Sequence, residues 1–184
     1  GSGPQTRGLV QQIASTFPVP LSHVWQEDLG FRAGAARNRA CARAQGEYLV
    51  FLDGDCVPLP DFVAQHRALA DARWFVAGNR ILLSPGFTAL ALQSGWALHT
   101  RSALQWLWAR LRGRINRLTP LLRLGNAGWR KVSPLRWQGA RPCNLAVWRE
   151  DFVAVNGFDE AYAGWGHEDA DLAVRLIRQG TRRK

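Results

Sequence analysis

The sequence predicts an α/β fold of three layers, with helices packed on both faces of a mostly parallel sheet. Short apolar, β-branched runs of strand length alternate along the chain with segments of helical periodicity. That alternation is typical of parallel α/β sheets. The composition agrees, because 184 residues with 47% hydrophobic and 21% charged residues suffice for a well-buried globular domain. We therefore expect one domain over residues 1–184.

Cysteine usage and hydropathy limit the class of protein further. Cys41, Cys56 and Cys143 are an odd number without a CxxC pair, which argues against a disulfide scaffold and a zinc site. No apolar run approaches the roughly eighteen residues of a membrane span. These features fit a reducing compartment, and we expect a cytoplasmic protein.

The order of the predicted elements supports the α/β class. Prolines end the first helix at Pro18 and begin the third at Pro60, and apolar runs mark the strands. We expect helices at 5–16, 33–44, 60–72, 89–98, 102–111, 149–155 and 167–179, and strands at 21–25, 48–52, 74–83 and 143–148.

The strand at 48–52 is the most informative one, because it ends at Asp53-Gly54-Asp55. Open α/β sheets bind their ligands at the carboxyl ends of strands, so both carboxylates should lie at such an edge. Neighbouring carboxylates repel unless a cation lies between them, and their oxygens suit Mg²⁺ or Mn²⁺. For this tripeptide alone an ordinary Asp-Gly turn is the better interpretation, and the position after a buried strand makes the two interpretations about equal.

The helix expected at 33–44 has an unusually small side. Ala36, Ala40 and Ala44 recur every four residues, with Ala33 and Cys41 beside them, so we expect this side to be buried against the sheet. Arg37 lies at the edge of that face, where it could reach a phosphate held near the helix N-terminus. The alternative, favoured from the helix alone, is a surface arginine that lies over the alanines.

Residues 85–140 predict a basic, tryptophan-rich helical insertion. The protein carries a net charge of +10, and no acidic residue occurs between 72 and 149, where 13 cations fall. Basic amphipathic segments with tryptophan often lie at a membrane interface, so we expect peripheral association with an anionic inner membrane face. A helical insertion packed on the sheet with a basic outer face explains the pattern equally well.

The helix expected at 167–179 begins with several acidic residues, which a helix dipole favours. Its apolar stripe comprises Leu172, Ala173 and Leu176. Asp169 lies in line with this stripe and should point inward, whereas Asp171 aligns with Arg175 and Arg178 and should form an ordinary surface ion pair. An inward carboxylate at a helix tip favours a catalytic role for Asp169.

Three motifs in this order resemble the family 2 glycosyltransferases of the GT-A fold. They are GAARNR at 34–39, LDGD at 52–55, and NGFD at 156–159 leading to GWGHED at 164–169. The C-terminal motif is similar to that of β-1,4-galactosyltransferases and chondroitin-polymerase-type enzymes. Together the motifs cover residues 29–60 and 141–180.

The resemblance implies a nucleotide-sugar donor, usually a UDP-sugar, and a divalent metal ion, Mn²⁺ or Mg²⁺. Asp55 would ligate the metal through the DXD motif, Asp53 would lie near the ribose and the metal, and Arg37 would lie by the pyrophosphate. The reaction would invert the anomeric centre, because an acceptor hydroxyl attacks as the diphosphate leaves.

The C-terminal motif implies further roles in donor and acceptor binding. Trp165 and Gly166 would belong to a mobile loop that closes over the donor, and Glu168 would bind sugar hydroxyls. Asp169 would be the general base. Asn144, at the start of the last strand, is assigned to donor or acceptor binding.

The resemblance also predicts that the domain is incomplete at both ends. In the family a first strand ends in an Asp-Asp-Gly-Ser-like turn, and this chain begins near such a Gly-Ser pair. A later strand supplies a histidine to the metal, and we expect that strand to follow Lys184.

The function expected from all these features is transfer of a sugar to a hydroxyl of a cell-surface glycan or lipid-linked acceptor. A polymerising polysaccharide synthase is the alternative within this class. A non-catalytic basic module for anionic lipid or nucleic acid is a third interpretation. The two aspartate motifs disfavour it, since carboxylates repel phosphates unless a metal intervenes, and we expect no nucleic-acid partner.

Overall fold

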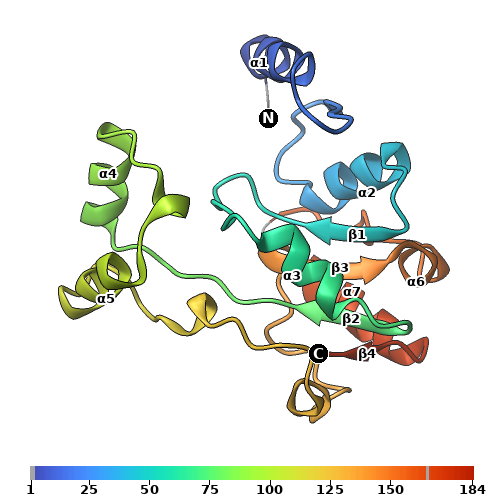
Figure 1. The fold of residues 1–184 in the computed structure, drawn as a ribbon. Coiled ribbons are helices and arrows are strands. Elements are labelled where there is room, and N and C mark those ends of the chain that lie inside the picture. Colours follow the sequence, from blue (N-terminus) through green and yellow to red (C-terminus); the bar gives the residue numbers. More distant parts are fainter. Residues whose placement is uncertain (1–2, 165) are drawn as a thin grey trace.

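A four-stranded sheet in the order β1-β3-β2-β4 forms the centre of the computed structural model, which describes residues 3–164 and 166–184 (Figure 1). The strands are β1 (Tyr48–Phe51), β2 (Trp74–Ala77), β3 (Leu145–Trp148) and β4 (Arg182–Arg183). Helices α2 (Ala33–Arg43), α3 (Phe62–Leu69), α6 (Arg149–Ala154) and α7 (Glu168–Arg178) surround it. The expected α/β class is confirmed.

The strand directions differ from the expectation of a mostly parallel sheet. β3 pairs antiparallel with both β1 and β2, and only β2 and β4 pair in parallel among the described strands. β1 and β2 still point the same way, toward the insertion (Figure 1). The chain returns from the insertion at their carboxyl ends, so β3 enters the sheet there and runs in the opposite direction.

Side chains alternate across the sheet and build a core on each face. One core joins Phe75, Leu145 and Val147 of the strands to Leu172 and Leu176 of α7. The other core joins Val76 and Ala146 to Leu69 of α3. The three-layer arrangement is therefore confirmed, with α7 and α3 covering opposite faces.

Helix α2 buries a different side from the one that the alanine repeat predicts. Its buried residues are Gly34, Ala35 and Cys41, whereas Ala36, Ala40 and Ala44 are exposed. The prediction holds for Cys41 and is wrong for the alanines, because contact with the 157–158 turn decides the helix orientation. A Cβ atom on Gly34 would lie 3.2 Å from Cβ of Phe158, so the helix makes its closest approach at the glycine.

The remaining N-terminal region packs less closely. Helix α1 (Pro4–Ala14) has no buried residue. The strand expected at 21–25 is absent, and that segment has no regular structure. Apolar residues alone do not make a strand, because its backbone groups need the edge of another strand. The sheet offers no such pairing to this segment.

The insertion contains two helices with a small core of their own. α4 (Pro85–Gln93) and α5 (Ala103–Leu111) pack through Phe87, Trp106 and Ile115. Short 3₁₀ turns occur at Leu98–Thr100, Thr119–Leu121, Gly128–Lys131 and Pro142–Asn144. In the part of the chain that the structure describes, no helix has the length and apolar character needed to span a membrane.

Two predicted strand boundaries also change. The strand expected at 74–83 ends at Ala77, because the Asn144 side chain occupies the space beside Gly78 and donates to the backbone oxygen of Asn79. After α7, Arg182–Arg183 already pairs with β2. A strand after the last helix therefore begins before Lys184, earlier than expected, whereas the metal-binding histidine that the resemblance assigns to such a strand stays a prediction.

Candidate active site

Arg37 connects three elements at the carboxyl end of β1. One terminal guanidinium nitrogen donates to Asp53 Oδ1 at 2.9 Å, and the other donates to Glu168 Oε1 at 3.1 Å. The guanidinium carbon also lies 5.4 Å from the centre of the Phe158 ring. Arg37 is thus a half-buried cation that bridges two carboxylates, and the surface-arginine alternative was wrong.

Asn38, which the sequence analysis missed, fixes α2 against the loop before α7. Its side chain donates to Phe158 O at 2.8 Å and accepts from Phe158 N at 2.9 Å. Gly157 makes this approach possible, because its φ is +65° and a Cβ there would lie 2.6 Å from Asn38 Oδ1. Asn38 therefore holds the GAARNR and NGFD motifs together, and its place within the GAARNR motif was the available signal.

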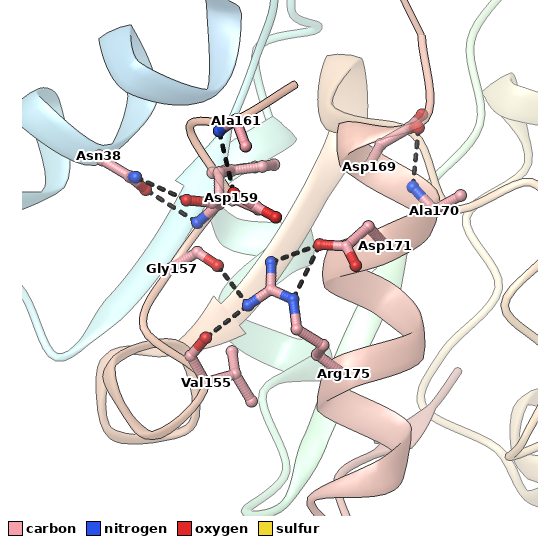
Figure 2. A network of polar contacts seen from close by, with 10 residues as sticks. Asn38, Val155, Gly157, Asp159, Ala161, Asp169, Ala170, Asp171 and Arg175 are labelled. Carbon is pink, nitrogen blue, oxygen red and sulfur yellow. Dashed lines mark hydrogen bonds and ion pairs between the residues drawn. The ribbon is translucent and has the colours of Figure 1, made fainter. Parts of the chain in front are cut away.

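The tip of α7 presents three carboxylates to different surroundings. Glu168 is buried beside Arg37, and Asp169 is half-buried with Oδ1 accepting from Ala170 N at 2.7 Å. Figure 2 shows the carboxyl groups of Asp169 and Asp171 pointing to different sides of the helix. The predicted apolar stripe is confirmed, because Leu172 and Leu176 are fully buried. Asp169 and Asp171 are both half-buried, so their burial does not show the predicted contrast between an inward and a solvent-facing carboxylate.

Asp171 differs from the ordinary surface ion pair that its spacing predicts. Its Oδ2 lies 2.7 Å and 2.8 Å from two nitrogens of Arg175, and both side chains are largely buried. Arg175 also donates to the backbone oxygens of Val155 and Gly157 (Figure 2). The pair therefore anchors the loop that follows α6, a role that depends on a tertiary contact.

Asp53 and Asp55 flank a turn that suits a hydrated divalent cation. Asp53 is half-buried and Asp55 is exposed, and no group of three potential metal ligands occurs among the described residues. Mg²⁺ is commonly held by one or two carboxylates together with substrate phosphates and water. These two aspartates fit that donor set. Burial, and next the charge of Asp55, raises the pKa of the neighbouring Cys56 thiol to about 11, so that side chain stays protonated.

Asn144 lies apart from the Arg37 cluster. Its amide bonds to His66 and to the backbone of Asn79, and it lies in the wall of a cavity of about 820 Å³. The cavity reaches the proposed metal site at Asp55, whereas Arg37 and Asp169 are not part of its wall. The sequence analysis missed His66, although its spacing from Leu69 places it on the buried face of α3.

Two glycines of the loop before α7, Gly164 and Gly166, have a left-handed backbone conformation. Trp165 lies outside the described residues. Gly166 has a φ of +105° and Gly164 a φ of +97°, values that favour glycine. The nitrogen of Gly164 donates to Phe31 O at 2.9 Å, which ties the loop to the segment before α2.

A three-layer α/β domain with carboxylates at the carboxyl end of β1 and at the tip of α7 is consistent with a GT-A-type glycosyltransferase. Two family models match the chain, and each covers a different part of it. The chain belongs to glycosyl transferase family 2, whose model matches residues 1–128. Residues 129–184 match the model of the N-terminal domain of galactosyltransferase. The resemblance of both halves is thereby confirmed.

The curated relatives that match the chain are named as a glucosyltransferase and a hyaluronan synthase. The chain is 26% identical over 213 residues to validoxylamine A glucosyltransferase of Streptomyces hygroscopicus subsp. jinggangensis (strain 5008), with 98% of this chain and 43% of the relative covered. It is 28% identical over 181 residues to hyaluronan synthase of Pasteurella multocida, with 89% of this chain and 18% of the relative covered. The chain spans less than half the length of these relatives.

Proposed function

We propose that this chain is the catalytic domain of an inverting, metal-dependent hexosyltransferase that moves a sugar from a UDP-sugar to a hydroxyl of a glycan or lipid-linked acceptor. One observation carries the proposal. Arg37 joins Asp53 of the DXD motif to Glu168 of the GWGHED motif, so the motifs meet in space. Family membership and the names of the relatives support glycosyl transfer.

In this proposal each side chain has a distinct task. Asp169 accepts the proton of the acceptor hydroxyl while that oxygen bonds to the anomeric carbon and the carbon–phosphate oxygen bond breaks. Asp53 and Asp55 would hold Mn²⁺ or Mg²⁺, which would neutralise the charge on the departing diphosphate. Arg37 has five N–H donors, so it can bind a phosphate oxygen while bonded to both carboxylates. Glu168 binds sugar hydroxyls.

A polymerising synthase is the second candidate. The match to a hyaluronan synthase favours it, although the chain covers 18% of that relative. Product length distinguishes the two candidates, because a single transfer yields one added sugar per acceptor and a polymerase yields a ladder.

The metal assignment is tested by UDP binding to the complete protein. We expect UDP to bind more tightly with Mn²⁺ than with EDTA, and Asp55→Ala to abolish that difference. The fold should persist because Asp55 is exposed. Glu150→Ala removes an exposed carboxylate of α6 and should leave the difference intact. Equal UDP affinity of the wild type with Mn²⁺ and with EDTA would contradict the assignment.

A further inference from the structure

Arg101 is enclosed by three aromatic rings in the insertion. Its guanidinium carbon lies 5.6 Å, 5.3 Å and 5.9 Å from the ring centres of Phe87, Trp96 and Trp106. The guanidinium carbon of Arg114 lies 5.5 Å from the centre of the same Phe87 ring. Both arginines are half-buried. The insertion therefore holds two cations around one small aromatic core.

Neither cation has a counter-charge in the insertion. No acidic residue occurs between 72 and 149, and within residues 3–164 and 166–184 the side chains of Arg101 and Arg114 have no ion pair or hydrogen bond. Aromatic faces attract a guanidinium group but leave its N–H donors unused. Charges that are removed from water are as a rule paired in proteins, so the two arginines indicate an anionic ligand.

A surface hollow of about 490 Å³ opens beside Arg101, and Gln105 also lies in its wall. Nε of Arg101 is sealed from solvent, whereas the terminal nitrogens, which have no partner among the described residues, stay accessible. Gln105 Oε1 accepts from Ser102 N at 2.8 Å in the capping box of α5. Its Nε2 therefore keeps two hydrogens for a ligand. The hollow thus brings together a guanidinium fork and an amide donor.

The surface that continues from this hollow is apolar. Leu104 adjoins Gln105, and with Leu107 and Leu111 it is exposed along one side of α5. Helices α4 and α5 stand to one side of the sheet (Figure 1). A ligand that matches this surface carries an oxyanion at one end and a hydrocarbon chain at the other. A phospholipid has both parts.

The donor set distinguishes between oxyanions. The planar fork of an arginine binds two oxygens at once, and Gln105 can donate to a third. A carboxylate has two oxygens, whereas a phosphate monoester presents three acceptor oxygens. We propose that Arg101 and Gln105 bind the terminal phosphate of a membrane phospholipid, whose acyl chains lie against the leucines of α5. Unlike attraction between a basic surface and an anionic one, this site recognises the headgroup.

Two arginine substitutions separate the site from net charge. Arg101→Lys keeps the positive charge and its attraction to the aromatic rings but loses the planar fork. We expect it to weaken binding of phosphatidic acid about tenfold or more, the factor for one hydrogen bond between charged groups. Arg110→Lys alters an exposed arginine of the same helix outside the hollow and should leave binding unchanged.

Two glutamine substitutions test the amide donor. Gln105→Glu keeps an oxygen for Ser102 N, so the capping box and the melting temperature should persist. It replaces the donor with a charged oxygen that repels phosphate, and binding should fall by at least as much as in Arg101→Lys. Gln93→Glu adds the same charge to α4 outside the hollow and should have a far smaller effect. If Arg101→Lys fails to fold, this pair decides.

The experiment uses the complete protein and compares vesicles that contain phosphatidic acid with phosphatidylglycerol vesicles of equal surface charge. Tighter binding to phosphatidic acid, lost in Arg101→Lys and Gln105→Glu, supports the proposal. Equal binding to both vesicles, or wild-type binding by those two variants, overturns it. Calorimetric titration then compares dihexanoyl phosphatidic acid with glycerol 3-phosphate, and the lipid should bind more tightly. Equal affinities would overturn the membrane lipid as the source of the phosphate.

Discussion

Glu168 places a carboxylate in a site with little water, since its side chain is 10% exposed. Arg37 supplies the counter-charge, and Asp53 shares it at 2.9 Å. Removing one partner of a buried pair leaves an uncompensated charge, which is strongly destabilising. Arg37 therefore maintains the site before any ligand binds, and this role explains why it bridges the two motifs.

Asp169 carries the sharpest prediction about the reaction. Asp169→Asn keeps the shape of the side chain and removes the proton acceptor. Because general-base catalysis contributes about 10²–10⁴-fold, we expect the transfer rate of the complete enzyme to fall by that factor. UDP binding should persist, because the diphosphate is held by other residues. Initial rates with the native acceptor, together with UDP affinity, are the measurements.

Asp171→Asn is the matched control on the same helix tip. The substitution weakens the bonds to Arg175, which anchors the backbone at Val155 and Gly157. We expect a loss of about 1.5–3 kcal/mol in the free energy of unfolding, the range for hydrogen bonds to charged groups. The transfer rate should stay within a few-fold of wild type. An inactive Asp171→Asn beside an active Asp169→Asn would refute the base assignment.

At the scale of elements, Asp71 ties the turn between α3 and β2 to the insertion. Its carboxylate lies 2.7 Å from the amines of Lys131 and Lys184 and accepts from Asn126 at 3.0 Å. The bond from Lys131, followed by that from Lys184, holds the pKa of Asp71 well below its ordinary value of 3.8. This carboxylate therefore links three segments that are distant in the sequence.

The lowered pKa of Asp71 makes this connection sensitive to acid. A depressed carboxyl pKa contributes stability that is fully present above the unfolded value of 3.8 and is lost as the pH falls below it. We therefore expect Asp71→Asn to be less stable than wild type at pH 7 and to lose less stability between pH 4 and about pH 2. Urea unfolding across this range measures the effect. Parallel curves for both proteins would contradict it, and Glu150→Gln serves as the exposed control.

At the scale of the whole molecule, the insertion presents an apolar stripe beside basic residues. Helix α5 buries Trp106 and Ala109 against the insertion core. Its opposite side exposes Leu104, Leu107, Trp108 and Leu111. Their spacing is that of a single helix face, and Arg110, Arg112 and Arg117 are exposed around it. Arg114 differs, because it is half-buried and lies over the Phe87 ring.

This stripe sharpens the predicted association with an anionic membrane surface. Each basic residue near such a surface contributes up to ~1 kcal/mol, and buried leucines add an apolar term. We expect sedimentation with anionic vesicles to weaken as salt rises and to fall when Leu104 and Leu111, or Arg110, Arg112 and Arg117, become serine. Val63→Ser, an exposed apolar position on α3, is the control. Identical sedimentation with neutral and anionic vesicles would rule out the association.

The sequence by itself determined the features that local periodicity encodes. Strand β1, helix α7 and the inward phase of its apolar stripe follow from the spacing of apolar residues, because each side chain's burial repeats with the period of its own element. The motif pattern likewise determined the family.

Only the tertiary structure decided what depends on contacts between distant segments. Arg37 meets Asp53 and Glu168 from 16 and 131 residues away, and His66 meets Asn144 across 78. The buried side of α2 was decided by the turn at Phe158, and the direction of β3 by where the chain returns to the sheet. Periodicity reports that a side chain is buried, but the identity of its neighbour depends on how the elements pack.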